Sequence, residues 1–256
     1  MKTKLIALLL LSVTFINIFS LGASAECSNW FIRRHGNERP DFPPDADMVK
    51  SYDGYFIDER VSGDSDKKVL YLTFDAGYEN GNIEKILDTL KEKGVPAAFF
   101  ILDHLIVANT DLVKRMGSEG HLICNHTKNH RDLTSATDEE IAKDITSLEE
   151  LCLERCGIEM SKYFRFPAGK YSESALKCVQ KLGYKTIFWS FAYEDWDNKR
   201  QPGAEYATKK ILDNTHNGAV ILLHPTSSTN AEILPSLIDA WRSMGYTFGT
   251  LDELTK

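Results

Sequence analysis

The sequence contains little cysteine, which excludes a fold held together by disulfides. Five cysteines occur in 256 residues, and an odd number cannot all pair with one another. Small secreted domains that depend on disulfides carry many more cysteines for their length. Cys152 and Cys156 are four residues apart on an expected helix, a spacing that neither joins two elements nor makes a zinc site by itself. We expect all five to be buried or free thiols.

An excess of positive charge is also absent. The chain has 30 lysines and arginines against 37 aspartates and glutamates, which gives a net charge of −7 with neutral histidines. Such a chain lacks the electrostatic attraction that draws proteins to nucleic acid or to anionic lipid. The composition therefore favours a neutral substrate, or one whose product is an amine, and no nucleic-acid partner is expected.

Long apolar runs are missing apart from one at the start of the chain. Two lysines precede an apolar stretch from Leu5 to Phe19, and the Ala-Ser-Ala sequence that ends at Ala25 has the small-x-small form that signal peptidase cuts. The stretch is shorter than the roughly 20 residues that span a bilayer, which disfavours the alternative of an uncleaved anchor. We predict a signal peptide over residues 1–25 and a secreted protein without a membrane span.

The full chain has the composition of an ordinary globular protein with one sizeable core, at 43% hydrophobic and 26% charged residues. Residues 26–66 look irregular, because prolines and aromatic residues are scattered through them. We expect them to form an N-terminal arm packed on the main domain, which would comprise residues 67–256.

From Lys68 onward, short apolar runs alternate with helical patterns. The runs that indicate buried strands are Val69–Thr73, Ala97–Leu102, His121–Cys124, Tyr163–Phe166, Thr186–Trp189, Ala219–Leu223 and Tyr246–Phe248. The helical patterns are Ile83–Lys93, Asp111–Ser118, Asp138–Leu153, Glu173–Leu182, Tyr206–Asn214 and Ala231–Met244. About seven such units predict a parallel α/β architecture, and the periodicity alone fits either a closed barrel or an open doubly wound sheet.

Polar residues lie at the end of five of these expected strands or soon after it. They are Asp75, His126, Arg165, Asp195 and His224. In both architectures the carboxyl ends of parallel strands form the functional face, so these side chains are expected to converge on one site.

Taken separately, each motif has a plain structural alternative. Asp75 could cap the helix that follows it, and one histidine of the pair His126 and His130 could be a satisfied core residue. Two imidazoles at this spacing can also point at a single divalent ion. Arg165 could hold a carboxylate with paired donors, or form a structural ion pair.

The last two motifs are Asp195-Trp196 and a histidine, His224, at the end of an apolar strand. An aspartate within reach of such a histidine can position and charge the imidazole for acid catalysis. Trp196 would offer a flat apolar wall to a sugar or an acyl group.

Together, the five segments resemble the polysaccharide deacetylase family, also known as carbohydrate esterase family 4. The segments are Thr73–Gly77, His126–His130, Arg165–Gly169, Asp195-Trp196 and Leu222–His224. The resemblance extends from about Val69 to Leu251, and it implies a distorted (β/α)7 barrel and a hydrolase that removes acetyl groups. It further implies one role for each matching residue: Asp75 as general base, Arg165 orienting that base, His224 as general acid, Asp195 tuning His224, His126 and His130 as metal ligands, and Leu222 and Trp196 lining the acetyl pocket.

A narrower resemblance is to the delta-lactam-forming peptidoglycan deacetylases of spore-forming bacteria. The run from Tyr71 to Gly81, the N-terminal arm and the ending Gly245–Phe248 are similar to theirs. This resemblance implies peptidoglycan glycan strands as partner, N-acetylmuramic acid as substrate, muramic delta-lactam of spore cortex as the eventual product, and a location on the cell-wall or spore-cortex side of the membrane. Chitin oligomers or acetylated xylan are the alternative substrates.

The sequence departs from the family at Ala76, where most members have a second aspartate that completes an Asp-His-His metal site. A catalytic zinc takes three protein ligands, so His126 and His130 alone would hold a divalent metal such as Zn²⁺ more weakly. The same departure motivates a further alternative, a carbohydrate-binding protein on an impaired catalytic scaffold. Absence of this aspartate is itself typical of the delta-lactam subgroup.

Overall fold

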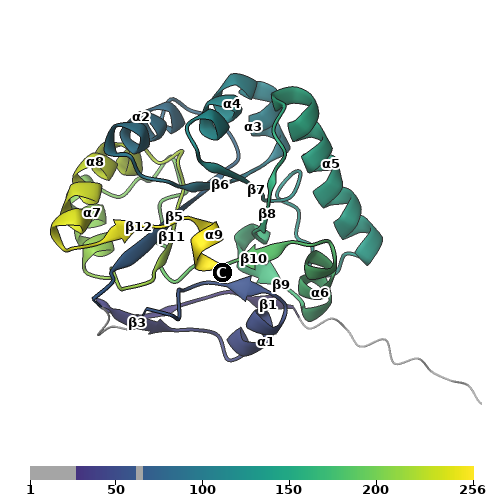
Figure 1. Cartoon of the computed structure of the whole chain (residues 1–256), viewed down its shortest axis with the longest axis horizontal. Helices are drawn as coiled ribbons and strands as arrows, with labels where there is room; N and C mark the ends of the chain where they lie inside the picture. Colours follow the sequence, from purple (N-terminus) through teal and green to yellow (C-terminus); the bar gives the residue numbers. More distant parts are fainter. Residues whose placement is uncertain (1–26, 62–65) are drawn as a thin grey trace, which may run out of the picture.

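A curled parallel sheet forms the centre of the protein, in a computed structural model that describes residues 27–61 and 66–256 (Figure 1). Its strands are β4 (Gly54–Tyr55), β5 (Val69–Ala76), β6 (Ala98–Ile101), β7 (Leu122–Asn125), β8 (Ser161–Phe164), β10 (Lys185–Ile187), β11 (Val220–Leu223) and β12 (Thr247–Phe248). They lie in the order β11-β5-β6-β7-β8-β10-β4, with β12 beside β5, and every pairing is parallel. The fold is the expected distorted (β/α)7 barrel. The predicted signal peptide lies outside the described residues.

Helices cover the outside of this sheet (Figure 1). They are α2 (Ile83–Lys93), α3 (Asp103–Ala108), α4 (Thr110–Ser118), α5 (Asp138–Cys156), α6 (Glu173–Lys181), α7 (Ala204–Leu212) and α8 (Ser228–Ser243), with a short α9 (Leu251–Leu254) at the end. Local sequence fixes several boundaries: Thr137 and Glu140 form a capping box at the start of α5, and Gly94 ends α2 in the left-handed conformation. Within the described residues, no helix is both long and apolar enough to cross a bilayer.

The alternation of side chains along β5 decides which residues reach the inside of the barrel. Phe74 and Ala76 are buried in the apolar layer between sheet and helices, together with Ile83 of α2. Tyr71 belongs instead to the separate core inside the barrel. Because successive side chains of a strand point to opposite faces, Asp75 shares the inner face with Tyr71 and lies at the carboxyl end of the strand.

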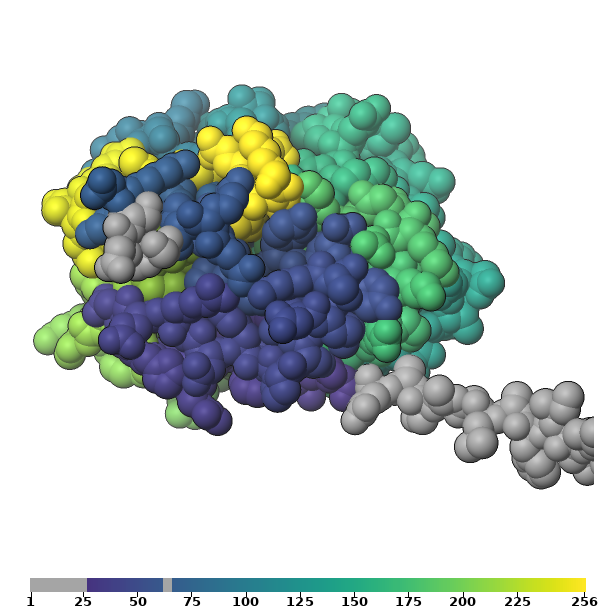
Figure 2. Space-filling view, turned by 60° about the horizontal axis from the view of Figure 1, so that its bottom comes forward, coloured from purple at the N-terminus to yellow at the C-terminus, as the bar shows by residue number. Residues whose placement is uncertain are grey.

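The N-terminal segment contains short elements where an irregular arm was expected. These are β1 (Ser28–Asn29), β2 (Arg33–His35), β3 (Glu38–Asp41), α1 (Ala46–Ser51) and the sheet strand β4. β1 pairs with β9 (Lys170–Tyr171), and β4 forms the edge of the main sheet beside β10. An isolated bridge between Ile57 and Ala219 links the region after β4 to the start of β11. Figure 2 shows this segment as a purple-to-blue band across one face, beside the yellow C-terminal residues.

Aromatic packing attaches the segment to the barrel. Trp30 is buried, its ring stacks on Phe188 at 4.6 Å between centroids, and its indole N–H donates to the carbonyl oxygen of Trp189 over 2.8 Å. Phe56 packs on the same tryptophan at 4.6 Å. Burial of such large rings is a major source of stability, so the segment is held to the barrel by core-like contacts.

Candidate active site

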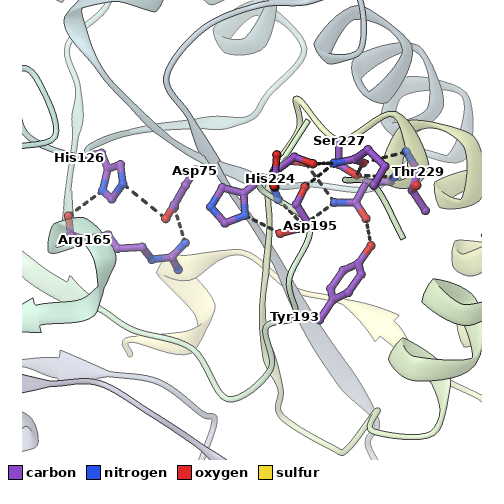
Figure 3. Close-up of polar contacts among 11 residues, drawn as sticks. Asp75, His126, Arg165, Tyr193, Asp195, His224, Ser227 and Thr229 are labelled. Atoms are coloured by element: carbon purple, nitrogen blue, oxygen red, sulfur yellow. Dashed lines mark hydrogen bonds and ion pairs between the residues drawn. The ribbon is translucent and has the colours of Figure 1, made fainter. Parts of the chain in front are cut away.

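A cavity of about 590 Å³ opens at the carboxyl ends of the strands. Its walls include six of the eight residues that the sequence singled out: Asp75, His126, His130, Trp196, Leu222 and His224. The other two, Arg165 and Asp195, are completely buried behind the wall and contact Asp75 and His224. The structure therefore brings all eight residues together, and Figure 3 shows five of them: Asp75, His126, Arg165, Asp195 and His224.

Asp75 forms a close ion pair with Arg165. Arg165 Nη1 donates to Asp75 Oδ1 over 2.7 Å, and the carboxylate is nearly enclosed, with 10% of the side chain exposed. Burial by itself would raise the pKa of Asp75, but the charge of Arg165, supported by His126 and His224, lowers that pKa below its ordinary value. Asp75 is therefore ionised at neutral pH and can accept a proton.

The guanidinium of Arg165 is itself fixed from several sides. Nε donates to the carbonyl oxygen of Ile187 over 2.9 Å, and Nη2 donates to Thr73 Oγ1 over 2.9 Å. The Cζ atom lies 4.1 Å from the ring centroid of Phe100, within cation–π range. Bonded at Nε, Nη1 and Nη2 and without exposed surface, Arg165 holds Asp75 in one orientation.

His126 has its lone pair turned toward Asp75. Its Nδ1–H donates to the carbonyl oxygen of Arg165 over 2.8 Å, which leaves Nε2 as an acceptor 3.5 Å from Asp75 Oδ2. Burial lowers the pKa of His126 to about 4, so the ring is neutral at pH 7. Two acceptor atoms this close need a shared partner, either a hydrogen-bond donor or a cation.

His130 is the second imidazole of this loop. Its ring centroid lies 5.0 Å from that of His126, and burial lowers its pKa as well. Thr127 and His130 have φ values of 68° and 60°, a left-handed conformation that costs free energy for residues other than glycine. This strained backbone conformation places both rings at the cavity wall.

The donor set around His126 does not fit a tightly held three-ligand metal. Among the residues that the structure describes, no group of three His, Cys, Asp or Glu side chains is spaced to hold an ion. Arg165 occupies one oxygen of Asp75, and Ala76, where the resemblance leads us to expect an aspartate, faces the apolar layer beneath the helices. Members of the polysaccharide deacetylase family generally depend on a metal, and this chain offers such an ion two imidazole nitrogens.

His224 is held by Asp195 on the other side of the cavity. Its Nδ1 lies 2.7 Å from Asp195 Oδ1, and its backbone N–H donates to Asp195 Oδ2 over 2.8 Å. Burial by itself would lower the pKa of His224, but the hydrogen bond and charge of Asp195, together with the charge of Asp75, raise that pKa above its ordinary value. Figure 3 shows the imidazole lying between Asp195 and Asp75.

A network that the sequence analysis missed supports Asp195. Asn230 Nδ2 donates to Asp195 Oδ2 over 2.6 Å and to the carbonyl oxygen of His224 over 3.1 Å, and Tyr193 donates its hydroxyl hydrogen to Asn230 Oδ1. Gln201 Nε2 donates to the carbonyl oxygen of Asp195 over 2.9 Å. A polar residue in the first turn of α8 and a glutamine in a loop carry no motif, so no local signal could have identified them.

The rest of the cavity wall is mainly apolar. Trp196 is 56% exposed at the rim, its ring centroid 6.0 Å from that of His224, whereas Leu222 is buried. Further lining residues are Gly77, Tyr78, Leu102, Ala168, Trp189, Ala192, Tyr193 and Thr226. A mostly apolar pocket with a few convergent polar groups is typical of a small-ligand site.

Comparison with known proteins agrees with this geometry. A family model described as polysaccharide deacetylase matches residues 62–187, a range that includes Asp75, His126, His130 and Arg165. The peptidoglycan-N-acetylmuramic acid deacetylase PdaA of Bacillus subtilis is 39% identical over 88% of this chain and 85% of its own length.

Solved structures of family 4 carbohydrate esterases share this fold. The structure of Bacillus subtilis PdaA, a family 4 carbohydrate esterase, superposes with a TM-score of 0.83 at 38% identity, covering 90% of this chain and 97% of that one. A family 4 carbohydrate esterase from Bacillus anthracis superposes with a TM-score of 0.73 at 38% identity and the same coverage. Sequence, fold and cavity together show that the chain belongs to the polysaccharide deacetylase family.

Proposed function

We propose that this protein hydrolyses the N-acetyl group of N-acetylmuramic acid in peptidoglycan. The observation that carries the proposal is a base and an acid on one cavity: Asp75, whose pKa Arg165 lowers, and His224, whose pKa Asp195 raises. Hydrolysis of an amide needs a base for water and an acid for the departing nitrogen, and this pair supplies both. The likeness to PdaA of Bacillus subtilis supports the choice of sugar.

Asp75 acts as general base. A water molecule that donates hydrogens to Asp75 Oδ2 and His126 Nε2 would satisfy both acceptors, which lie 3.5 Å apart. As the water oxygen attacks the acetyl carbon, Asp75 takes one of its protons, and Arg165 keeps the carboxylate oriented. Backbone N–H groups of the turn at Gly77 stabilise the oxyanion, where one well-placed donor contributes about 3 kcal/mol.

His224 acts as general acid. Because its Nδ1–H is engaged by Asp195, the proton on Nε2 is the one available to the amide nitrogen. Transfer of that proton lets the C–N bond break, which yields acetate and a free amine on the sugar. Leu222 and Trp196 line the space for the acetyl methyl and the sugar face.

His126 and His130 are the residues that would hold a divalent ion such as Zn²⁺. A bound ion would supply positive charge for the oxyanion. The described residues offer such an ion two donors where a catalytic zinc takes three protein ligands, and Asp75 and His224 carry out the proton transfers without it.

The setting of the reaction follows from the substrate. Residues 1–25 have the features of a signal peptide, so the protein would act outside the cytoplasm, on the cell-wall or spore-cortex side of the membrane. The amine released on muramic acid lies on the ring that also bears a lactyl carboxylate, and condensation of the two gives muramic delta-lactam. The protein would therefore act during sporulation.

Acetate release from muramoyl peptidoglycan, compared with chitin oligomers and acetylated xylan, tests the proposal directly. Asp75→Asn should abolish acetate release while circular dichroism and thermal unfolding show a folded protein. Asp111→Asn, an exposed residue of α4, is the matched control and should retain activity. Near-normal turnover by Asp75→Asn would refute the assignment of the base, and faster hydrolysis of chitin oligomers or xylan would refute the choice of sugar.

A further inference from the structure

A second cleft, of about 710 Å³, opens beside the catalytic cavity. The two hollows share four wall residues: Trp189, Ala192, Tyr193 and Trp196. A glycan whose acetamide lies next to Asp75 can therefore extend around Trp196 into the second cleft without leaving the protein surface. The proposed base and acid, Asp75 and His224, do not line this cleft.

Three cations line the cleft: Arg34, Arg200 and Lys210. None of them forms an ion pair with a residue that the structure describes, and Arg34 and Lys210 are half-buried. Glu194 is the one acidic residue of the wall. In a chain with 37 acidic and 30 basic residues, a cleft with three cations and one acid is a local reversal of charge. Unpaired cations gathered in a hollow attract an anion.

Arg34 is placed there by the N-terminal segment. It lies on β2 of the hairpin β2–β3, and Asn37 at the turn of this hairpin donates to the carbonyl oxygens of Leu212 and Thr215 over 2.7 and 3.0 Å. These bonds fix the hairpin to the end of α7, the helix that carries Lys210. The guanidinium carbon of Arg34 also lies 5.8 Å from the ring centroid of Phe191. The cleft is thus built jointly by the segment and the barrel.

We infer that this cleft binds a carboxylate of the glycan substrate and so selects muramoyl glycans over neutral polysaccharides. The inference rests on the proposed function. Because the cleft shares a wall with the catalytic cavity, the anion belongs to the same glycan that carries the acetamide. In peptidoglycan that anion is a carboxylate, on the lactyl ether of the muramic ring or on an attached stem peptide. Arginine binds carboxylates with paired donors, and exposed Tyr206 beside them offers an aromatic face to a sugar.

Charge reversal tests the inference. Arg34→Glu and Lys210→Glu are compared with Arg33→Glu, a neighbour on the same strand that does not line the cleft. Each protein is assayed on four glycans of equal length: muramoyl glycan with free lactyl carboxylates, the same glycan with stem peptides, the same glycan with its carboxylates amidated, and a chitin oligomer. Thermal unfolding confirms that each variant is folded.

Both cleft variants should raise KM about tenfold or more on a carboxylate-bearing glycan, with kcat little changed, because an attraction becomes a repulsion. The amidated glycan and the chitin oligomer should show little change. A rise in KM on the peptide-free glycan alone identifies the lactyl carboxylate as the bound group. A rise in KM on the peptide-bearing glycan alone identifies a carboxylate of the stem peptide. An equal rise on the amidated glycan, no rise on any glycan, or the same rise with Arg33→Glu overturns the inference.

Binding separates this inference from the proposed function. Calorimetry with the Asp75→Asn protein measures affinity for the free-carboxylate, stem-peptide and amidated muramoyl glycans without turnover. Tighter binding of a carboxylate form, lost on adding Arg34→Glu, supports the cleft even if the wild-type protein released no acetate. Equal affinity for all three glycans overturns it even if acetate release is confirmed.

Discussion

Asp195 holds His224 at two points. One carboxylate oxygen lies 2.7 Å from Nδ1 of the imidazole, and the other accepts the backbone N–H of the same residue over 2.8 Å. The first contact fixes the tautomer and raises the pKa, and the second fixes the position of the backbone after β11. Both the charge and the direction of the acid therefore depend on one buried side chain.

The first prediction concerns pH. Activity requires Asp75 without its proton and His224 with its proton. As pH increases, kcat/KM should therefore rise through the pKa of Asp75, at a pH below the ordinary carboxyl range. It should fall at alkaline pH, above the ordinary histidine pKa of about 6.5, because the pKa of Asp75 is lowered and that of His224 is raised. The measurement is kcat/KM against pH on a soluble muramoyl glycan.

Asp195→Asn should move the alkaline limb of this profile to lower pH. Without the charge of Asp195, burial dominates and lowers the pKa of His224, so the acid is deprotonated at neutral pH. The rate at pH 7 should fall by roughly 10²- to 10⁴-fold, the usual contribution of general acid catalysis. Asp197→Asn, an exposed neighbour, is the control and should leave the profile in place. If the alkaline limb of Asp195→Asn lay at the same pH as that of the wild-type protein, another group would be the acid.

The second prediction concerns stability. Arg165→Met leaves the buried carboxylate of Asp75 without its partner, and loss of one member of a buried pair costs about 3–5 kcal/mol of unfolding free energy. The double variant Arg165→Met/Asp75→Asn should regain part of that loss, since no uncompensated charge remains. Urea unfolding at pH 7 measures both proteins.

A surface pair provides the comparison. Arg131 and Glu140 lie 3.2 Å apart with about half of each side chain exposed, so Arg131→Met should cost no more than about 1 kcal/mol. If Arg165→Met lowered the unfolding free energy by no more than Arg131→Met does, other groups would have to compensate the charge of Asp75. A double variant less stable than Arg165→Met would contradict the buried-charge argument.

Much of the barrel could be predicted because its elements have strong periodicity and clear ends. The pattern Ile83–Lys93 coincides with α2, since its apolar face and the stop at Gly94 are both local signals. The seven expected strands all occur, with boundaries shifted by a few residues. The convergence of Asp75, His126 and His224 followed from one rule, that parallel strands share their carboxyl ends.

The remaining features depend on contacts between distant parts of the chain. β4 has two residues, too few for a periodicity signal, yet it forms the edge of the sheet beside β10. The choice of a barrel over an open sheet depends on bridges such as Phe191 with Ile221, which no local pattern encodes. Asn230 reaches Asp195 across 35 positions of sequence, so only the folded chain reveals it.

The third prediction concerns the metal. After chelation and dialysis the protein should retain most of its acetate release, because the base, its orienting arginine and the acid are complete without an ion. Added Zn²⁺ should bind weakly in calorimetry, since the described residues offer His126 and His130 and no third side chain spaced to join them. Ala76 places a methyl group in the apolar layer beside the helices, so position 76 supplies no carboxylate to the ion.

His130→Gln should reduce the binding of Zn²⁺, and His104→Gln, an exposed histidine of α3, is the control that should leave it unchanged. Acetate release that disappears on chelation and returns with one equivalent of Zn²⁺ would contradict this prediction. It would show that a ligand outside these two imidazoles, the substrate or Asp75 itself, completes the coordination. If Asp75 is that ligand, its Oδ2 would face the ion while Oδ1 keeps its bond to Arg165, and the two positive charges together would lower the pKa of Asp75 further.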